Sequence, residues 1–256
     1  MAQKVNPFSY RLGITKPWSS RWFFKRSLNF YLQEDHEIRV FVYKKILSAG
    51  IAGFAIERTG ENIRVIIQAA KPGLIIGRGG KGIEELKSNL LKIIVKLRKK
   101  NNFDKKFLLN LTIEELKRTE ISAAVIAQTV ASEIERRQPY RRVIKRQLEF
   151  AMQNRDVKGA KLKVSGRLNG AEISRHDSLA AGKMPLQTLR ADIDYGTATS
   201  FNTYGTVGIK VWIYKGEVFD NSKISVKDGS AFSSRGGSAF SSIGGSAFGG
   251  GGGGKN

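Results

Sequence analysis

The chain has 256 residues, a formal net charge of +22 and no cysteine, and 41% of its residues are hydrophobic. The absence of thiols excludes a disulfide framework, a thiolate metal site and cysteine catalysis, while the hydrophobic content suffices for one or two globular domains. So large a positive charge indicates a polyanionic partner, because neutralising phosphates releases counterions and supplies affinity. A membrane surface is the competing polyanion, but no apolar run approaches the roughly 20 residues of a spanning helix. We therefore expect nucleic acid, and no membrane, as the partner.

Neither the start of the chain nor its histidines indicates secretion or metal chemistry. Residues 1–4 lack the apolar segment of a secretory signal, so we expect a cytoplasmic protein. His36 follows an acidic helix start and His176 lies in an expected polar turn, and neither has a partner at metal-ligand spacing. We therefore expect no metal and no cofactor.

Residues 1–33 mix aromatic and basic side chains without a regular period, which predicts an irregular arm. Such a mixture can stack on bases and neutralise phosphates, and we expect Lys4 and Arg11 to contact RNA. Alternatively, Trp18 and Trp22 dock the arm onto the rest of the protein. The sequence leaves both interpretations open.

The next segment predicts one helix and two strands. A helix is expected over Asp35–Gly50, with Gly50 as its stop and apolar residues at helical spacing, which are Ile38, Phe41, Val42 and Ile46. Alternating apolar residues predict strands over Ile51–Glu57 and Ile63–Gln68, joined by a turn around Gly60.

A glycine-rich stretch, Gly77-Arg78-Gly79-Gly80-Lys81, follows the second strand after one short helical turn. It leads into a helix near residues 81–99 with apolar positions at Ile83, Leu86, Leu90, Ile93 and Leu97. A strand, a short helix, a Gly-x-x-Gly loop and an amphipathic helix form the core of a KH domain, whose loop clamps about four single-stranded nucleotides. Glycines let the main chain approach a sugar-phosphate backbone, and a helix N-terminus favours phosphate. We therefore expect all five residues of the stretch to bind RNA.

The same glycines also spell G-x-G-x-x-G, the dinucleotide fingerprint. That fingerprint needs an acidic residue about 20 positions later to hold a ribose, and residues 96–100 are mostly basic instead. A P-loop is excluded because no G-K-[ST] follows. A further strand over Phe107–Ile113 completes the element order of a type II KH domain, which we place at residues 34–117.

The rest of the chain predicts a second domain over residues 118–220 and a disordered tail over 221–256. Two helices are expected, one capped by Thr119 and running to about Arg137, and one from Pro139 to about Asn154. Three strands follow, over 160–167, 186–195 and 206–214, so we expect an α+β fold with helices on one face of a sheet. The tail repeats Gly-Ser-Ala-Phe and cannot bury enough surface to offset its ordering entropy.

The second predicted helix carries a run of cations with no carboxylate between residues 136 and 146. At 100° per residue, four of them fall on one face, opposite the apolar Val143, Ile144, Leu148 and Ala151. An exposed helix normally mixes charge signs for mutual support, so this face indicates a polyanionic ligand. We expect its four cations to bind RNA: Arg141, Arg142, Lys145 and Arg146.

With these motifs in order, the chain resembles the bacterial small-subunit ribosomal protein three family. The resemblance rests on residues 3–5, 11–14, 16–18, 72–80, 140–146, 164–168, 170–173, 189–195 and 210–217. It implies binding to small-subunit rRNA, contacts with small-subunit ribosomal proteins ten and fourteen, and a place on the ribosome beside incoming mRNA. It also implies that Arg141, Arg142 and Lys145 match the cations credited with unwinding messenger at the entry pore. Two features depart from the family: Gly80 stands where a second lysine is common in the loop, and the tail has no counterpart.

Three classes of function follow from these observations. The leading one is a structural RNA-binding protein of the small ribosomal subunit. A free KH regulator of transcripts is the second, and sedimentation with the subunit separates the two. An enzyme is the third, but the adjacent pairs 84–85 and 114–115 point to different sides of their elements. We expect Asp192 and Asp194 on the solvent or RNA side, and we expect no enzymatic activity.

Overall fold

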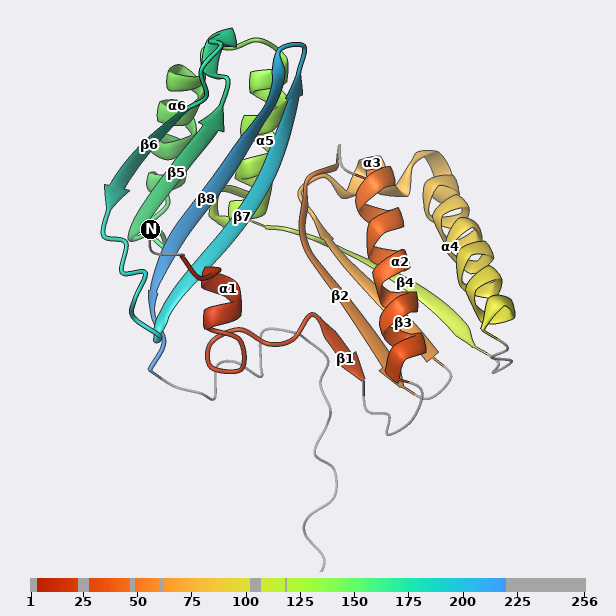
Figure 1. Ribbon diagram of the computed structural model, residues 1–256. Coiled ribbons are helices and arrows are strands. Elements are labelled where there is room, and N and C mark those ends of the chain that lie inside the picture. The colour runs from red at the N-terminus through yellow and green to blue at the C-terminus, as the bar shows by residue number, and fades with distance from the viewer. Residues whose placement is uncertain are drawn as a thin grey trace, which may run out of the picture.

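The computed structural model describes residues 4–22, 28–46, 49–59, 62–101, 107–117 and 119–219. Its described residues form two four-stranded sheets, each covered on one face by helices (Figure 1). We call residues 28–117 the first half, residues 119–219 the second half, and residues 4–22 the N-terminal segment. The predicted α+β class is confirmed, whereas the predicted turn at Gly60 and the tail lie outside the described residues.

The sheet of the first half contains four strands in the order β1-β2-β3-β4. They are β1 (Ser20–Trp22), β2 (Ile51–Thr59), β3 (Asn62–Ala69) and β4 (Leu108–Glu115). β2 and β3 pair antiparallel, as expected of neighbours along the chain, while β1 and β4 pair parallel to β2 and β3 respectively. β3 alternates strictly between buried and half-buried residues, which shows that one of its faces packs on the helices.

The described residues of the first half include three α-helices, α2 (Leu28–Ile46), α3 (Pro72–Ile76) and α4 (Lys81–Lys100). The apolar stripe predicted for α2 is confirmed, with Ile38, Val42 and Ile46 buried. The helix nevertheless begins at Leu28, within the arm expected to be irregular, and not at Asp35. α4 buries Leu86 and Leu90, as predicted. Further along the helix, Ile94 and Arg98 are buried in place of the predicted Ile93 and Leu97.

Four charged side chains are buried together at one end of this core. The Arg58 Nη1 atom lies 2.8 Å from Glu34 Oε2, and its Nη2 atom lies 2.5 Å from Asp35 Oδ1. The Arg98 Nε atom lies 2.8 Å from Glu34 Oε1, and the Arg98 guanidinium stacks 4.2 Å from the centroid of Phe107. We call these four charged residues the buried ion network. Two of its members, Glu34 and Asp35, belong to the predicted acidic helix start that precedes His36 in the sequence.

The sheet of the second half is antiparallel throughout, in the order β6-β5-β8-β7. Its strands are β5 (Gly159–Gly166), β6 (Arg175–Gly182), β7 (Ala191–Asn202) and β8 (Gly205–Glu217). β6 was not predicted, because most of its residues are exposed and polar or small, and it places His176 in an edge strand instead of a turn. The strand predicted over residues 186–195 begins at Ala191 and continues further along the chain.

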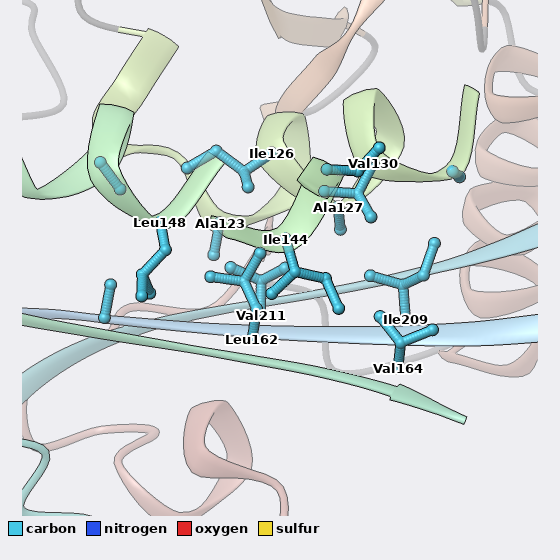
Figure 2. Close-up of a cluster of buried hydrophobic side chains, with 14 of the residues drawn as sticks. Ala123, Ile126, Ala127, Val130, Ile144, Leu148, Leu162, Val164, Ile209 and Val211 are labelled. Atoms are coloured by element: carbon cyan, nitrogen blue, oxygen red, sulfur yellow. The ribbon is translucent and has the colours of Figure 1, made fainter. Parts of the chain in front are cut away.

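Helices α5 (Ala123–Glu135) and α6 (Tyr140–Met152) cover one face of this sheet (Figure 1). Figure 2 shows the core between these helices and the sheet, where Ile144 lies beside Val211 and Leu162. Every member of this buried cluster is alanine, valine, leucine or isoleucine. Such aliphatic packing follows from the apolar stripes of the two helices and the alternation of β5 and β8.

The start of α5 differs from the sequence prediction. Thr119 begins a short 3₁₀ turn, and the helix itself starts at Ala123. The Ala123 N–H donates to Asp194 Oδ2 at 2.9 Å, so a carboxylate from β7 caps the helix, where negative charge is favoured. Asp192 in turn lies 2.7 Å from Lys16 Nζ. Both aspartates therefore make structural contacts within the protein, which corrects their expected place on the solvent or RNA side.

The N-terminal segment contacts both halves. Its helix α1 (Pro7–Tyr10) packs on β7, and its strand β1 extends the first sheet. Arg11 is fully buried: its guanidinium donates to the carbonyl oxygens of Pro7, Leu186 and Thr188 at 2.8–3.1 Å. The expected RNA contact by Arg11 is therefore wrong, because a buried guanidinium engaged by three protein carbonyls does not reach an external phosphate.

One further contact joins the two halves directly. The Gln128 side chain of α5 accepts a hydrogen bond from Ile51 N–H and donates one to Ile51 C=O, both at 3.1 Å. The side-chain amide thereby pairs with the backbone of Ile51, the first residue of β2, as a neighbouring strand would. None of the described helices is both long and apolar enough to cross a membrane.

Candidate nucleic-acid interface

The glycine-rich loop is built by residues in the left-handed region. Gly77 ends α3, with its N–H donating to Gly73 C=O at 3.0 Å, and has a φ of +69°. Gly79 and Gly80 follow with φ of +62° and +82°. Three such residues within one turn explain the glycines, since a Cβ disfavours this conformation.

The space around these glycines shows which of them allows close helix packing and which leave the backbone accessible from outside. A Cβ on Gly82 would lie 2.4 Å from Ile75 C=O, so this glycine allows α3 and α4 to pack closely. A Cβ on Gly79 or Gly80 would meet nothing within 4 Å. The backbone at these two positions is therefore open on its outer side, as a main chain that approaches a phosphodiester must be.

Positive charge flanks this open backbone. Arg78 and Lys81 are exposed, and Lys81 is the first residue of α4, whose N-terminal N–H groups have no side-chain cap. Neither side chain makes an ion pair with another described residue. The arrangement can hold an anion through main-chain N–H groups and two cations, which is the chemistry that a phosphate requires.

The second candidate surface is the cationic face of α6, which we define as Arg141, Arg142, Lys145 and Arg146. The side chains of Arg141, Lys145 and Arg146 are 79%, 74% and 52% exposed. The apolar residues on the opposite side of the helix are buried, as predicted. The sequence therefore predicted the orientation of this helix correctly.

Neighbouring elements supply a few carboxylates to this face. Arg146 lies 2.5 Å from Glu133 of α5, and Arg141 lies 3.4 Å from Asp177 of β6. A hydrogen bond to the Tyr140 hydroxyl, with Asp177 nearby, raises the pKa of Arg141. Arg142 has no ion pair with another described residue. Lys145 lies 3.9 Å from Glu149 of the same helix, so three of the four cations have a carboxylate within 4 Å, while all four stay at the surface.

The N-terminal segment presents a smaller set of groups. Lys4 is exposed, and the Trp18 side chain is among the most exposed aromatics, at 66%. Trp22 belongs to β1 and is half-buried, so it contributes to docking. Docking is thus shown for part of the segment, while stacking by Trp18 stays a prediction.

A cavity that the sequence did not predict lies beside the first residue of α6. It has a volume of about 460 Å³ and is lined by α5, α6 and the β7–β8 hairpin, with Tyr140, Phe201 and Tyr204 among its walls. Its hairpin residues lie more than 60 residues after its helix residues in the chain, so no local pattern could reveal the cavity. Within the described residues, no group of three or more histidines and carboxylates is placed to hold a metal ion.

The sheet order, the short helix, the Gly-x-x-Gly loop and the following helix together define a KH-domain protein. Residues 37–121 match the family model of the KH domain, and residues 130–213 match that of the ribosomal protein S3 C-terminal domain.

Comparison with characterised proteins identifies the family. The chain is 47% identical over 226 residues to the small ribosomal subunit protein uS3 of Clostridium novyi (strain NT), which covers 88% of this chain and 97% of the relative. It is 44% identical over 220 residues to uS3 of Desulfovibrio desulfuricans, covering 86% and 98% respectively. The corresponding protein of Lawsonia intracellularis is 46% identical over 220 residues, with the same coverage. The chain therefore belongs to the uS3 family of small ribosomal subunit proteins, which are structural proteins and not enzymes.

Proposed function

We propose that the protein is a structural RNA-binding component of the small ribosomal subunit in the cytoplasm. In this proposal the glycine-rich loop and Lys4 bind small-subunit rRNA, and the cationic face of α6 binds mRNA at the entry channel. Small-subunit ribosomal proteins ten and fourteen are the proposed neighbours. We further propose a division into an arm (1–33), a KH domain (34–117), a C-terminal domain (118–220) and a tail (221–256).

One observation carries the messenger part of the proposal. The cationic face of α6 is exposed, while the opposite face is anchored in an aliphatic core, so its charges are held on a rigid helix. Like charges on adjacent turns repel one another, and a phosphate backbone offsets that cost. Holding separated strands by their phosphates needs neither a nucleotide site nor a catalytic base.

The test replaces Arg141, Arg142 and Lys145 by alanine. The fold should survive, because Val143, Ile144 and Leu148 are untouched. Ribosomes carrying the variant should slow mainly on messengers with stable downstream hairpins, measured as the translation rate on matched structured and unstructured messengers. Equal slowing on both messengers would contradict an unwinding role.

A charge-preserving variant is the matched control. Arg141→Lys, Arg142→Lys and Lys145→Arg keep the positive charge and should retain most of the speed on hairpins, since the proposed role is electrostatic. Subunits carrying each variant are first shown to assemble by sedimentation. A variant that cannot assemble would indicate that the face anchors the protein to rRNA.

A further inference from the structure

The cavity beside α6 is open to solvent on one side and is lined by four separate parts of the second half. Its walls come from the end of α5, the start of α6, the 3₁₀ turn Leu168–Gly170 and the hairpin that joins β7 to β8. A volume of about 460 Å³ falls within the range that small planar ligands occupy in proteins.

The walls of this cavity present exposed aromatic rings. Phe201 is 71% exposed and Tyr204 is 62% exposed at the tip of the hairpin, and Tyr140 is half-buried on the opposite side. Exposing large rings to water is unfavourable unless a ligand covers them. Flat aromatic faces are the surfaces on which single-stranded bases stack.

The polar groups around the rings favour a nucleotide over an apolar ligand. Arg137 and Arg167 line the cavity, although Arg167 already donates to the carbonyl oxygens of Ala171 and Tyr204 at 2.9 Å, and Glu135 is the acidic residue among the lining groups. The Glu135 carboxylate already accepts the Phe201 N–H at 3.0 Å, so part of its charge is engaged. The amides of Gln138 and Asn202 add donors and acceptors of the kind that read base edges.

Two residues with positive φ also line this cavity. Among the described residues, Arg137 and Asn169 are the non-glycine residues with positive φ, at +61° and +54°, and both line this cavity. Strained backbone of this kind concentrates at binding sites, where the surroundings hold it in place.

The cavity is continuous with the cationic face of α6. Tyr140 lines the cavity, and its hydroxyl accepts a hydrogen bond from Arg141 Nε at 3.1 Å. On the other side, Arg146 Nη2 donates to Gln138 Oε1 at 3.2 Å. Two residues of the cavity wall thus contact cations of the face, which places the cavity beside the surface proposed for phosphates.

We infer that this cavity binds one nucleobase of single-stranded RNA, stacked against Phe201 and Tyr204, while Arg141 and Arg142 hold the adjoining phosphates. The inference rests on the proposed function of α6 and adds base contact to it. Stacking is tolerant of sequence because every base has a flat face, so the site suits a messenger of any sequence.

The test measures binding of the full chain to a fluorescent 12-nucleotide oligouridine and to an abasic strand of the same length. Phe201→Ala with Tyr204→Ala should weaken binding of oligouridine by about fivefold or more, the loss expected for one stacked base. Binding of the abasic strand and the salt dependence should not change, because no phosphate contact is removed. Both side chains are exposed, so the melting temperature should be unchanged. Phe201→Trp with Tyr204→Trp, which keeps flat rings, should bind oligouridine like the unmodified chain.

A site-resolved measurement complements the affinities. Oligouridine that carries 5-iodouridine is crosslinked to the full chain by light, and the attached peptides are identified by mass spectrometry. We expect crosslinks at Tyr140, Phe201 or Tyr204. Crosslinks confined to other segments, or equal losses of affinity for both strands, would overturn the inference. Crosslinking of Phe201 to a neighbouring protein in assembled subunits would also overturn it, since a protein segment would then occupy the cavity.

Failure of this inference is distinguishable from failure of the proposed function. Replacing Arg141, Arg142 and Lys145 by alanine should weaken binding of both strands and reduce the salt dependence. If these losses occur and the aromatic variant binds normally, the proposed function stands and the base site is wrong. If the aromatic variant alone loses binding, the cavity binds a base and the cationic face is not the phosphate site.

Discussion

The first and second halves pack in the same way but differ in what they bury. Each places two long helices on one face of a four-stranded sheet. The first half encloses the buried ion network beside its aliphatic core, whereas among the described residues of the second half every buried side chain is uncharged. The second half carries its charge outside, on the cationic face of α6.

The two halves therefore use charged side chains in different ways. Burying ions costs desolvation that their attraction barely offsets, so the network in the first half is a poor source of stability but a strict geometric constraint. It joins the middle of α2, the end of β2 and the last turn of α4 through Glu34, Arg58 and Arg98. Because α4 begins at the glycine-rich loop, fixing its far end also fixes the direction of the helix that presents the loop.

The largest expected effect comes from breaking the network. Arg58→Ala leaves Glu34 and Asp35 buried, with Asp35 deprived of its Arg58 contacts, and should lower the free energy of unfolding by about 3–5 kcal/mol. Urea denaturation of the full chain measures the loss.

The matched control for Arg58 is an arginine on the neighbouring strand. Arg64 of β3 has a side chain that is 41% exposed and lies 3.8 Å from Glu57. Arg64→Ala should change the free energy of unfolding by at most about 1 kcal/mol, because exposed ion pairs contribute little. Similar losses for the two variants would remove the distinction between the halves.

A smaller effect is expected at the contact between the halves. Gln128→Ala removes both hydrogen bonds to the Ile51 backbone and should cost about 1–2 kcal/mol. Scanning calorimetry should also show a broader transition, because the two halves would unfold less cooperatively. Gln153→Ala, at an exposed position after α6, should leave the calorimetric transition as it was; broadening in that control would show that the readout is not specific to the contact.

The smallest expected effect tests the hydrophobic packing that the two halves share. Ile56 and Ile209 lie at matched, fully packed positions in the two aliphatic cores, at 0% and 1% exposure. Ile56→Val and Ile209→Val each remove one methylene and should each cost about 0.5–1.5 kcal/mol. Equal losses of unfolding free energy, measured by denaturation, would show that the halves differ in their charged residues and not in their apolar packing. A much larger loss for Ile56→Val would show that the packing differs as well.

Local patterns predicted much of this architecture. The apolar stripes of α2 and α6, the strands β2 and β3, and the glycine-rich loop follow from periodicity and turn chemistry within a few residues of each other. The exposure of the cationic face of α6 also follows, because its apolar positions had to face a core.

Such local patterns could not predict contacts between segments that are distant in the chain. The sequence indicates an acidic helix start at Glu34 but does not show that Arg58 and Arg98 meet this residue in the interior. Arg11 was predicted to contact RNA for the same reason, since two of its three carbonyl partners are 175 and 177 residues away. The edge strand β6 lacks a buried face along most of its length, so it has no alternation to detect.

The position of the N-terminal segment has a consequence for the order of events during synthesis. This segment is translated well before Leu186, Thr188 and Asp192, which hold it. Its strand β1 can pair with β2 as soon as the first sheet forms, whereas Arg11 lacks two of its carbonyl acceptors until residues 186–188 exist. Domains fold as units while the chain emerges. Docking of Arg11 therefore waits until residues 186–188 have been translated, and a chain that lacks them exposes a cation that the finished protein conceals.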